Sequence, residues 1–168
     1  MRKEITAAIK CGPKVEARDW RSLQVSELSR AERTMRFCEA YLKIPDGEQV
    51  GQNLQLEDFQ EAFFYSVLDN KNLTRQAIFS VARKNGKSAL VACLLISFLV
   101  GPEAKQNAQL VCGAMSREQA SVVFKLASNM IMFSDQLREL VKVVESTRRI
   151  VGLPMNTEFR AIAADGKT

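Results

Sequence analysis

The stretch VARKNGKS, Val81–Ser88, decides how the rest of the chain is interpreted. The run before it, Gln76–Val81, is short and rich in β-forming residues, which predicts a strand. The run after it, Lys87–Val100, is almost entirely apolar and is followed by Gly-Pro, which predicts a buried helix with a defined end. The three segments together predict a strand that turns directly into a helix.

The turn itself matches most of a known phosphate-binding pattern. In the Walker A sequence G-x-x-x-x-G-K-[S/T], Gly86, Lys87 and Ser88 fill the last three places, while Val81 replaces the first glycine. Backbone N–H groups of such a loop, together with the start of the next helix, favour phosphate oxygens. We therefore expect Lys87 to reach the β- and γ-phosphates and Ser88 to ligate Mg²⁺. The plainer alternative is a corner with an exposed lysine.

Two further cations, Arg83 and Lys84, lie inside the loop. They form either a solvated basic turn or, for Arg83, a group that stabilises the γ-phosphate charge during phosphoryl transfer. Both interpretations stay open at this point. The candidate residues for nucleotide contact in the loop are Arg83, Lys84, Asn85, Gly86, Lys87, Ser88 and Ala89.

Strand and helix patterns alternate downstream of the loop. A strand is expected at Gln109–Ala114, then a helix from the capping-box residue Ser116 to about Phe133. Further strands are expected around Leu140–Val144 and Thr157–Ala163. This order is typical of an α/β fold in which helices flank a parallel sheet.

Two helices are expected upstream of the loop. The first follows the capping box Ser29–Glu32, and the second ends at the polar run Asp69–Asn72. The phenylalanines of this region are expected in the core rather than as stacking platforms for bases; they are Phe59, Phe63, Phe64 and Phe79. Residues 1 to about 28, around Trp20, are expected to form a loosely held leader.

The composition narrows the class of function. The formal net charge of +5 favours anionic partners such as nucleic acid. The chain has no histidine and no C-x-x-C pair, which excludes Cys/His zinc sites and Ser-His-Asp triads within it. Cys93 and Cys112 lie in apolar runs and are expected to be reduced core thiols, as in a cytosolic protein. The most apolar run, Ala89–Val100, is too short for a membrane span.

The chain resembles the large subunit of the tailed-phage terminase. Four segments, in the family's order, support the resemblance: LQLEDFQ (Leu54–Gln60), ARKNGKS (Ala82–Ser88), GAMSREQA (Gly113–Ala120) and FRAIAADGKT (Phe159–Thr168). The family typically has an arginine where Arg83 stands, and its upstream segment ends in a glutamine that contacts adenine. That role would fall on Gln60, although a polar position on an amphipathic helix also explains this residue.

The resemblance implies a P-loop ATPase core that uses ATP and Mg²⁺, with Arg83 and Lys87 as catalytic residues. It implies that residues 1–53 form a leader and helical extension, and that residues 54–168 form part of the ATPase domain. ATP hydrolysis would drive double-stranded DNA into a procapsid in the host cytoplasm. The implied partners are the small terminase subunit, the portal protein and further copies of the chain in a ring, without a membrane.

The resemblance also implies an element that this sequence does not contain. In the family an apolar strand ending in Asp-Glu, the Walker B motif, follows the segment that here ends at Thr168. We therefore expect a partial large subunit. A nucleotide- or DNA-binding module without catalysis and a helicase-like translocase of the P-loop class stay open as alternatives.

Overall fold

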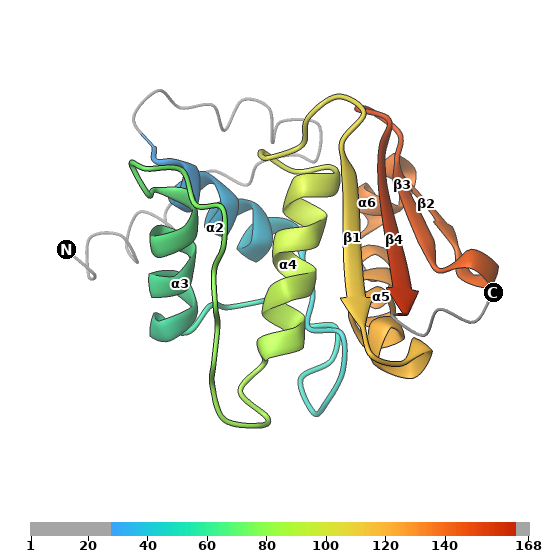
Figure 1. Cartoon of the computed structure of the whole chain (residues 1–168). Helices are drawn as coiled ribbons and strands as arrows, with labels where there is room; N and C mark the ends of the chain where they lie inside the picture. Colours follow the sequence, from blue (N-terminus) through green and yellow to red (C-terminus); the bar gives the residue numbers. More distant parts are fainter. Residues whose placement is uncertain (1–27, 164–168) are drawn as a thin grey trace.

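The computed structural model describes residues 28–163, so the expected leader around Trp20 and the end of FRAIAADGKT lie outside the described residues. The described elements are shown in Figure 1. In chain order they are α2 (Arg30–Tyr41), α3 (Asp58–Leu68), α4 (Lys87–Leu99), β1 (Gln109–Ala114), α5 (Arg117–Met132), α6 (Asp135–Leu140), β2 (Val141–Val144), the 3-10 turn η2 (Glu145–Thr147), β3 (Arg149–Gly152) and β4 (Thr157–Ala163).

The sheet has four strands in the order β1-β4-β3-β2, and it is mixed rather than parallel. Strands β1 and β4 are parallel, with Val111 opposite Arg160, whereas β3 runs antiparallel to both β4 and β2. The expectation of a parallel sheet was therefore wrong for two of the three strand pairs. The reason is two short connections, because a tight turn between neighbouring strands can only produce antiparallel pairing. The 3-10 turn η2 joins β2 to β3, and the turn of residues 153–156 joins β3 to β4. Strand β3 itself was not predicted.

The strand expected at Gln76–Val81 is not part of the sheet. This segment runs without secondary structure toward the start of α4 (Figure 1). Its Phe79 ring packs on α3 instead, 4.5 Å from the Phe63 ring and 6.4 Å from the Phe59 ring between centroids. Ile78 is 85% exposed. The strand prediction was therefore wrong: the segment has a β-forming composition, but no described strand pairs with it.

The predicted helices are confirmed in place, and the serines predicted at the starts of α2 and α5 cap them. The reciprocal capping box is complete at α2, and at α5 the structure shows its serine half. Ser29 and Glu32 form the predicted capping box at α2, with the Ser29 hydroxyl accepting from the Glu32 N–H at 3.2 Å. Ser116 accepts from the Gln119 N–H at 3.2 Å at the start of α5. These side chains satisfy backbone donors that a helix start leaves free. Helix α4 ends within one residue of its predicted end.

One apolar core joins α2, α3, α4 and α5 to the inner face of the sheet. Its largest fully buried side chains include Phe37 of α2, Phe64 of α3 and Phe159 of β4. The expectation that Phe59 belongs to this core was wrong, because Phe59 is 40% exposed. Phe59 and Phe63 lie one helical turn apart and face Phe79, whereas Phe64 faces inward.

Two of the three described cysteines, Cys38 and Cys93, are buried, and Cys112 is half-buried on β1; all three thiols are free. Burial raises the pKa of Cys112, which disfavours the reactive thiolate. Within residues 28–163, no helix combines the length and apolarity that crossing a membrane requires.

The outer face of the sheet carries a cluster of charges around Glu158 of β4. Its carboxylate accepts hydrogen bonds from the Arg160 guanidinium and forms an ion pair with Arg149 Nε at 2.6 Å. Arg160 and then Arg149 lower the pKa of Glu158 to about 2. Arg149 of β3 is thus tied to β4 by an ion pair on the face of the sheet.

Candidate functional site

The loop that precedes α4 is shaped by two residues in the left-handed region of backbone space. Gly86 is the N-cap of α4, with φ 65° and ψ 14°, and Lys84 has φ 68°. A left-handed backbone costs glycine nothing and costs a residue with a Cβ about 1–2 kcal/mol, which favours the glycine at position 86. Lys84 adopts this backbone in spite of that cost. The Gly86 carbonyl accepts the first helical bond, from the Leu90 N–H at 2.9 Å. The main chain therefore turns tightly and enters the helix at Lys87.

The start of α4 favours negative charge. Gly86 has no side chain to cap the helix, and the first turn of α4 contains no acidic residue. Arg83, Lys84 and Lys87 are exposed around this helix end. Because the N–H groups of a helix start have partial positive charge, this arrangement attracts an anion such as a phosphate.

Helix α3 brings Gln60 to this loop. The Gln60 side-chain oxygen accepts from the Glu57 N–H at 3.1 Å, which fixes the amide at the start of α3. The Gln60 Nε2 atom lies so near the loop that a Cβ added at Gly86 would be 3.2 Å from it. The structure therefore places Gln60 beside the phosphate-binding pattern, far from it in sequence. Only the family resemblance pointed to this residue.

The other residues predicted to contact the nucleotide lie at the start of α4 or just before it. Ser88 and Ala89 lie half-buried in the first turn of α4, directly after Lys87, and Asn85 is exposed in the bend before Gly86. Within the part of the chain that the structure describes, no three or more His, Cys, Asp or Glu side chains gather into a metal-binding group. A single hydroxyl at Ser88 suits Mg²⁺ that is mostly held by phosphates and water, as this ion usually is.

Comparison with known proteins identifies the family. The family model described as "Terminase large subunit, ATPase domain" matches residues 59–167, which is more than half of the chain. The chain belongs to the terminase large-subunit ATPase family. The resemblance found in four sequence segments is thus confirmed, and so is the α/β fold class with its P-loop-type core.

Two matches to the large terminase of phage HK97, one in sequence and one in structure, show how much of such a protein this chain represents. It is 46% identical over 141 residues to the "Terminase, large subunit" of Enterobacteria phage HK97, covering 84% of this chain and 28% of that protein. It also matches the crystal structure of the HK97 bacteriophage large terminase, with a TM-score of 0.78 and 45% identity over 84% of this chain and 29% of that one. The chain therefore spans less than a third of the length of the HK97 large terminase.

Sequence reasoning missed two features of the site. The contact between Phe79 and α3 ties the segment before the loop to the helix that positions Gln60. Glu103, after the end of α4, is buried although it is acidic. A carboxylate directly after a Gly-Pro helix stop gives no signal of burial in the sequence, because its partner lies 73 residues away.

Proposed function

We propose that this chain is the ATP-binding part of a DNA-packaging motor of the terminase large-subunit type. The observation that supports the proposal most directly is the start of α4, where Gly86 leaves the helix uncapped among Arg83, Lys84 and Lys87. A triphosphate matches this end in charge and in hydrogen-bonding character. Membership of the terminase ATPase family supports ATP as the ligand.

Each loop residue receives a role in this proposal. The main-chain N–H groups from Asn85 to Ala89 surround the phosphates, and the Lys87 ammonium contacts the β- and γ-phosphates. Arg83 stabilises the charge that develops on the γ-phosphate, and Lys84 adds to the positive field of the loop. Gln60 hydrogen-bonds adenine through the amide that lies beside Gly86.

Magnesium has one proposed ligand in this chain, the Ser88 hydroxyl. Bound there, Mg²⁺ would neutralise part of the phosphate charge, and the Ser88 hydroxyl would help to hold it. Ser88 is half-buried in the first turn of α4, directly after Lys87.

The wider role is also a proposal. ATP hydrolysis in the intact protein would move double-stranded DNA into a procapsid in the host cytoplasm, and the formal net charge of +5 fits a DNA partner. The small terminase subunit, the portal protein and further copies in a ring complete the assembly. Residues 54–168 are proposed as part of the ATPase domain, with residues 1–53 as its extension.

Isothermal titration of the 168-residue chain with ATP and Mg²⁺ tests the proposal. We expect saturable binding that Lys87→Ala weakens by at least tenfold, because a charged hydrogen bond of about 1.5–3 kcal/mol is lost. Lys125→Ala is the matched control, since Lys125 is an exposed lysine of α5, and should bind as the wild type does. Equal heats for the Lys87 and Lys125 variants would contradict the assignment.

Phosphate release under the same conditions separates an ATPase from a binding module. Release by the wild type well above that of the Lys87→Ala variant supports catalysis by this chain. Binding without release supports the alternative, a nucleotide-binding module that depends on other parts of the protein for hydrolysis.

A further inference from the structure

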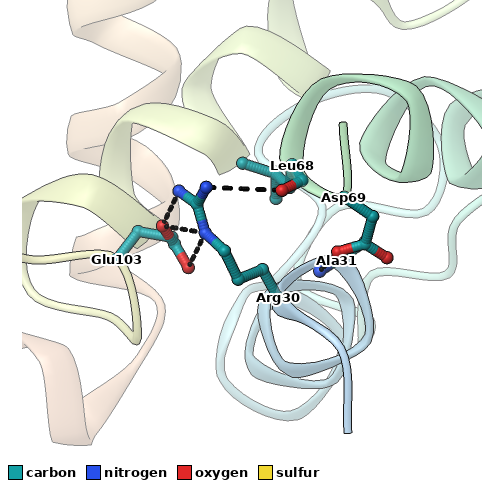
Figure 2. Close-up of polar contacts among 5 residues, drawn as sticks. All are labelled: Arg30, Ala31, Leu68, Asp69 and Glu103. Carbon is teal, nitrogen blue, oxygen red and sulfur yellow. Dashed lines mark hydrogen bonds and ion pairs between the residues drawn. The ribbon is translucent and has the colours of Figure 1, made fainter. Parts of the chain in front are cut away.

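Arg30, the first residue of α2, joins the ends of two other elements (Figure 2). Its Nε donates to both carboxylate oxygens of Glu103, at 3.1 and 3.3 Å, and its Nη2 also contacts Glu103. Its Nη1 donates to the Leu68 carbonyl at 3.3 Å. Leu68 is the last residue of α3, and Glu103 follows the end of α4. One guanidinium therefore connects the C-terminal ends of α3 and α4.

This connection is charged, and its carboxylate side is shielded from water. The Glu103 side chain is only 5% exposed, and the Arg30 side chain is 39% exposed. The hydrogen bond to Glu103 raises the pKa of Arg30 above its ordinary value. A second hydrogen bond lies beside these contacts. The Ala31 N–H donates to the Asp69 carboxylate at 3.0 Å. The start of α2 is thus fixed to the end of α3 by two directional contacts.

The opposite ends of α3 and α4 meet at the phosphate loop. Gln60, in the first turn of α3, lies against Gly86, the N-cap of α4. The two helices run in the same direction and both pack on α2 (Figure 1). Consequently α3 is held at one end by Arg30 and reaches the loop with the other.

Helix α3 also supports the chain that enters the loop. Phe79 rests on the rings of Phe59 and Phe63 rather than in the sheet. Buried Phe64 and Leu68 keep α3 attached to the core, but apolar contacts have little directional preference. The hydrogen bonds of the Arg30 guanidinium are directional, so they fix the position of the end of α3 relative to the end of α4.

We propose that Arg30 and Glu103 are positioning residues of the nucleotide site: by fixing the far end of α3 against the end of α4, they hold the Gln60 amide at the place beside Gly86 where it meets the base. The inference rests on the proposed function, because it concerns the same site. Neither Arg30 nor Glu103 contacts the nucleotide. The pair acts on recognition of the base, and the phosphate contacts of α4 do not depend on it.

The test compares two ligands, ATP and inorganic tripolyphosphate, each with Mg²⁺, by isothermal titration of the full chain. Removing Arg30 alone would leave a buried carboxylate and risks unfolding, so the main variant is the double substitution Arg30→Met with Glu103→Met. Replacing both members of a buried pair by apolar groups of similar size is often neutral for stability. Glu103→Gln, which keeps an oxygen for the guanidinium, is the conservative variant.

The matched control is Arg138→Met. Its ion pair with Asp135, at 2.5 Å, is exposed on α6, which packs on α5 and β2 rather than on α3. We expect this variant to bind both ligands as the wild type does. Circular dichroism of every variant checks that the fold is retained.

The double variant should bind ATP about three- to tenfold more weakly than the wild type, as expected for one misplaced neutral hydrogen bond, and tripolyphosphate with unchanged affinity. Glu103→Gln should lie between the double variant and the wild type. Unchanged ATP affinity in the folded double variant would overturn the inference, and so would an equal loss for both ligands. Wild-type chain that binds neither ligand refutes the proposed function itself, and the inference with it.

Discussion

Replacing Gly86 with alanine adds a side chain where the backbone is left-handed and the Gln60 amide lies close by. Gly86 has φ 65°, and a Cβ there would lie 3.2 Å from Gln60 Nε2. Gly47 provides the matched control, because it has φ 91° but a Cβ there would meet nothing within 4 Å. Both substitutions place a side chain on a left-handed backbone, and only one of them crowds the proposed nucleotide site.

The left-handed backbone costs an alanine roughly 1–2 kcal/mol at either position. For a chain of this size, that loss lowers the melting temperature by about 2–8 °C. Contact with Gln60 adds little to this cost, since the end of a flexible side chain can move. The effect on ligand binding differs, because relaxation at Gly86 displaces N–H groups that are proposed to hold phosphate. Losing one charge-assisted hydrogen bond of about 1.5–3 kcal/mol weakens ATP binding roughly 10- to 100-fold.

Thermal denaturation and isothermal titration with ATP and Mg²⁺ together check this prediction. Gly86→Ala and Gly47→Ala should melt at similarly reduced temperatures, and only Gly86→Ala should lose ATP affinity. If the two variants bound ATP equally well, the backbone at Gly86 would have no role in holding the ligand, and the reasoning would be refuted.

Three further predictions concern stability. Ser29→Ala removes the N-cap of α2 and should lower the free energy of unfolding by about 1 kcal/mol, measured by urea denaturation; an unchanged midpoint would contradict the capping role. Phe64→Ala should cost about 3–5 kcal/mol in the same assay because Phe64 is fully buried, and Phe59→Ala should cost clearly less because Phe59 is 40% exposed; equal costs would contradict the assigned core. The pKa of Glu158 is lowered to about 2 in the folded chain, so its carboxylate stabilises the fold above about pH 4.5 and this contribution is lost as the pH falls toward 2. The stability difference between wild type and Glu158→Gln should therefore shrink across that range in acid titrations followed by circular dichroism, and a constant difference would argue against the ion pairs.

The sequence predicted correctly those helices whose starts and lengths depend on neighbouring residues. The capping residues Ser29 and Ser116 marked helix starts, and the apolar run after Lys87 gave α4 nearly to its last residue. These features depend on hydrogen bonds within a few residues and on the helical period, so one stretch of sequence contains the information.

Features that depend on distant partners were not predictable in the same way. The segment Gln76–Val81 has strand composition, yet a strand needs a paired neighbour, and Phe79 packs on α3 instead. The parallel sheet was inferred from the alternation of strands and helices, which does not reveal the short hairpin of β2 and β3. Burial of Glu103 depends on Arg30, and no local pattern links these two residues.

In the candidate site, too, some residues could be predicted from neighbouring sequence and others depend on distant partners. Gly86, Lys87 and Ser88 follow from a contiguous motif, and the structure adds the left-handed N-cap that explains the glycine. The position of Gln60 beside Gly86 requires α3 to lie against the loop, which the residues alone do not state and which the family resemblance supplied.

The central claim is that the main-chain N–H groups at the start of α4 hold the phosphates of a nucleotide. Amide chemical shifts of the isotopically labelled chain, followed by NMR during titration with ATP and Mg²⁺, test it most directly. The largest shifts should appear at the amides of Asn85–Ala89 and at the side-chain amide of Gln60. A saturating titration whose shifts fall elsewhere and leave these amides unmoved would contradict it.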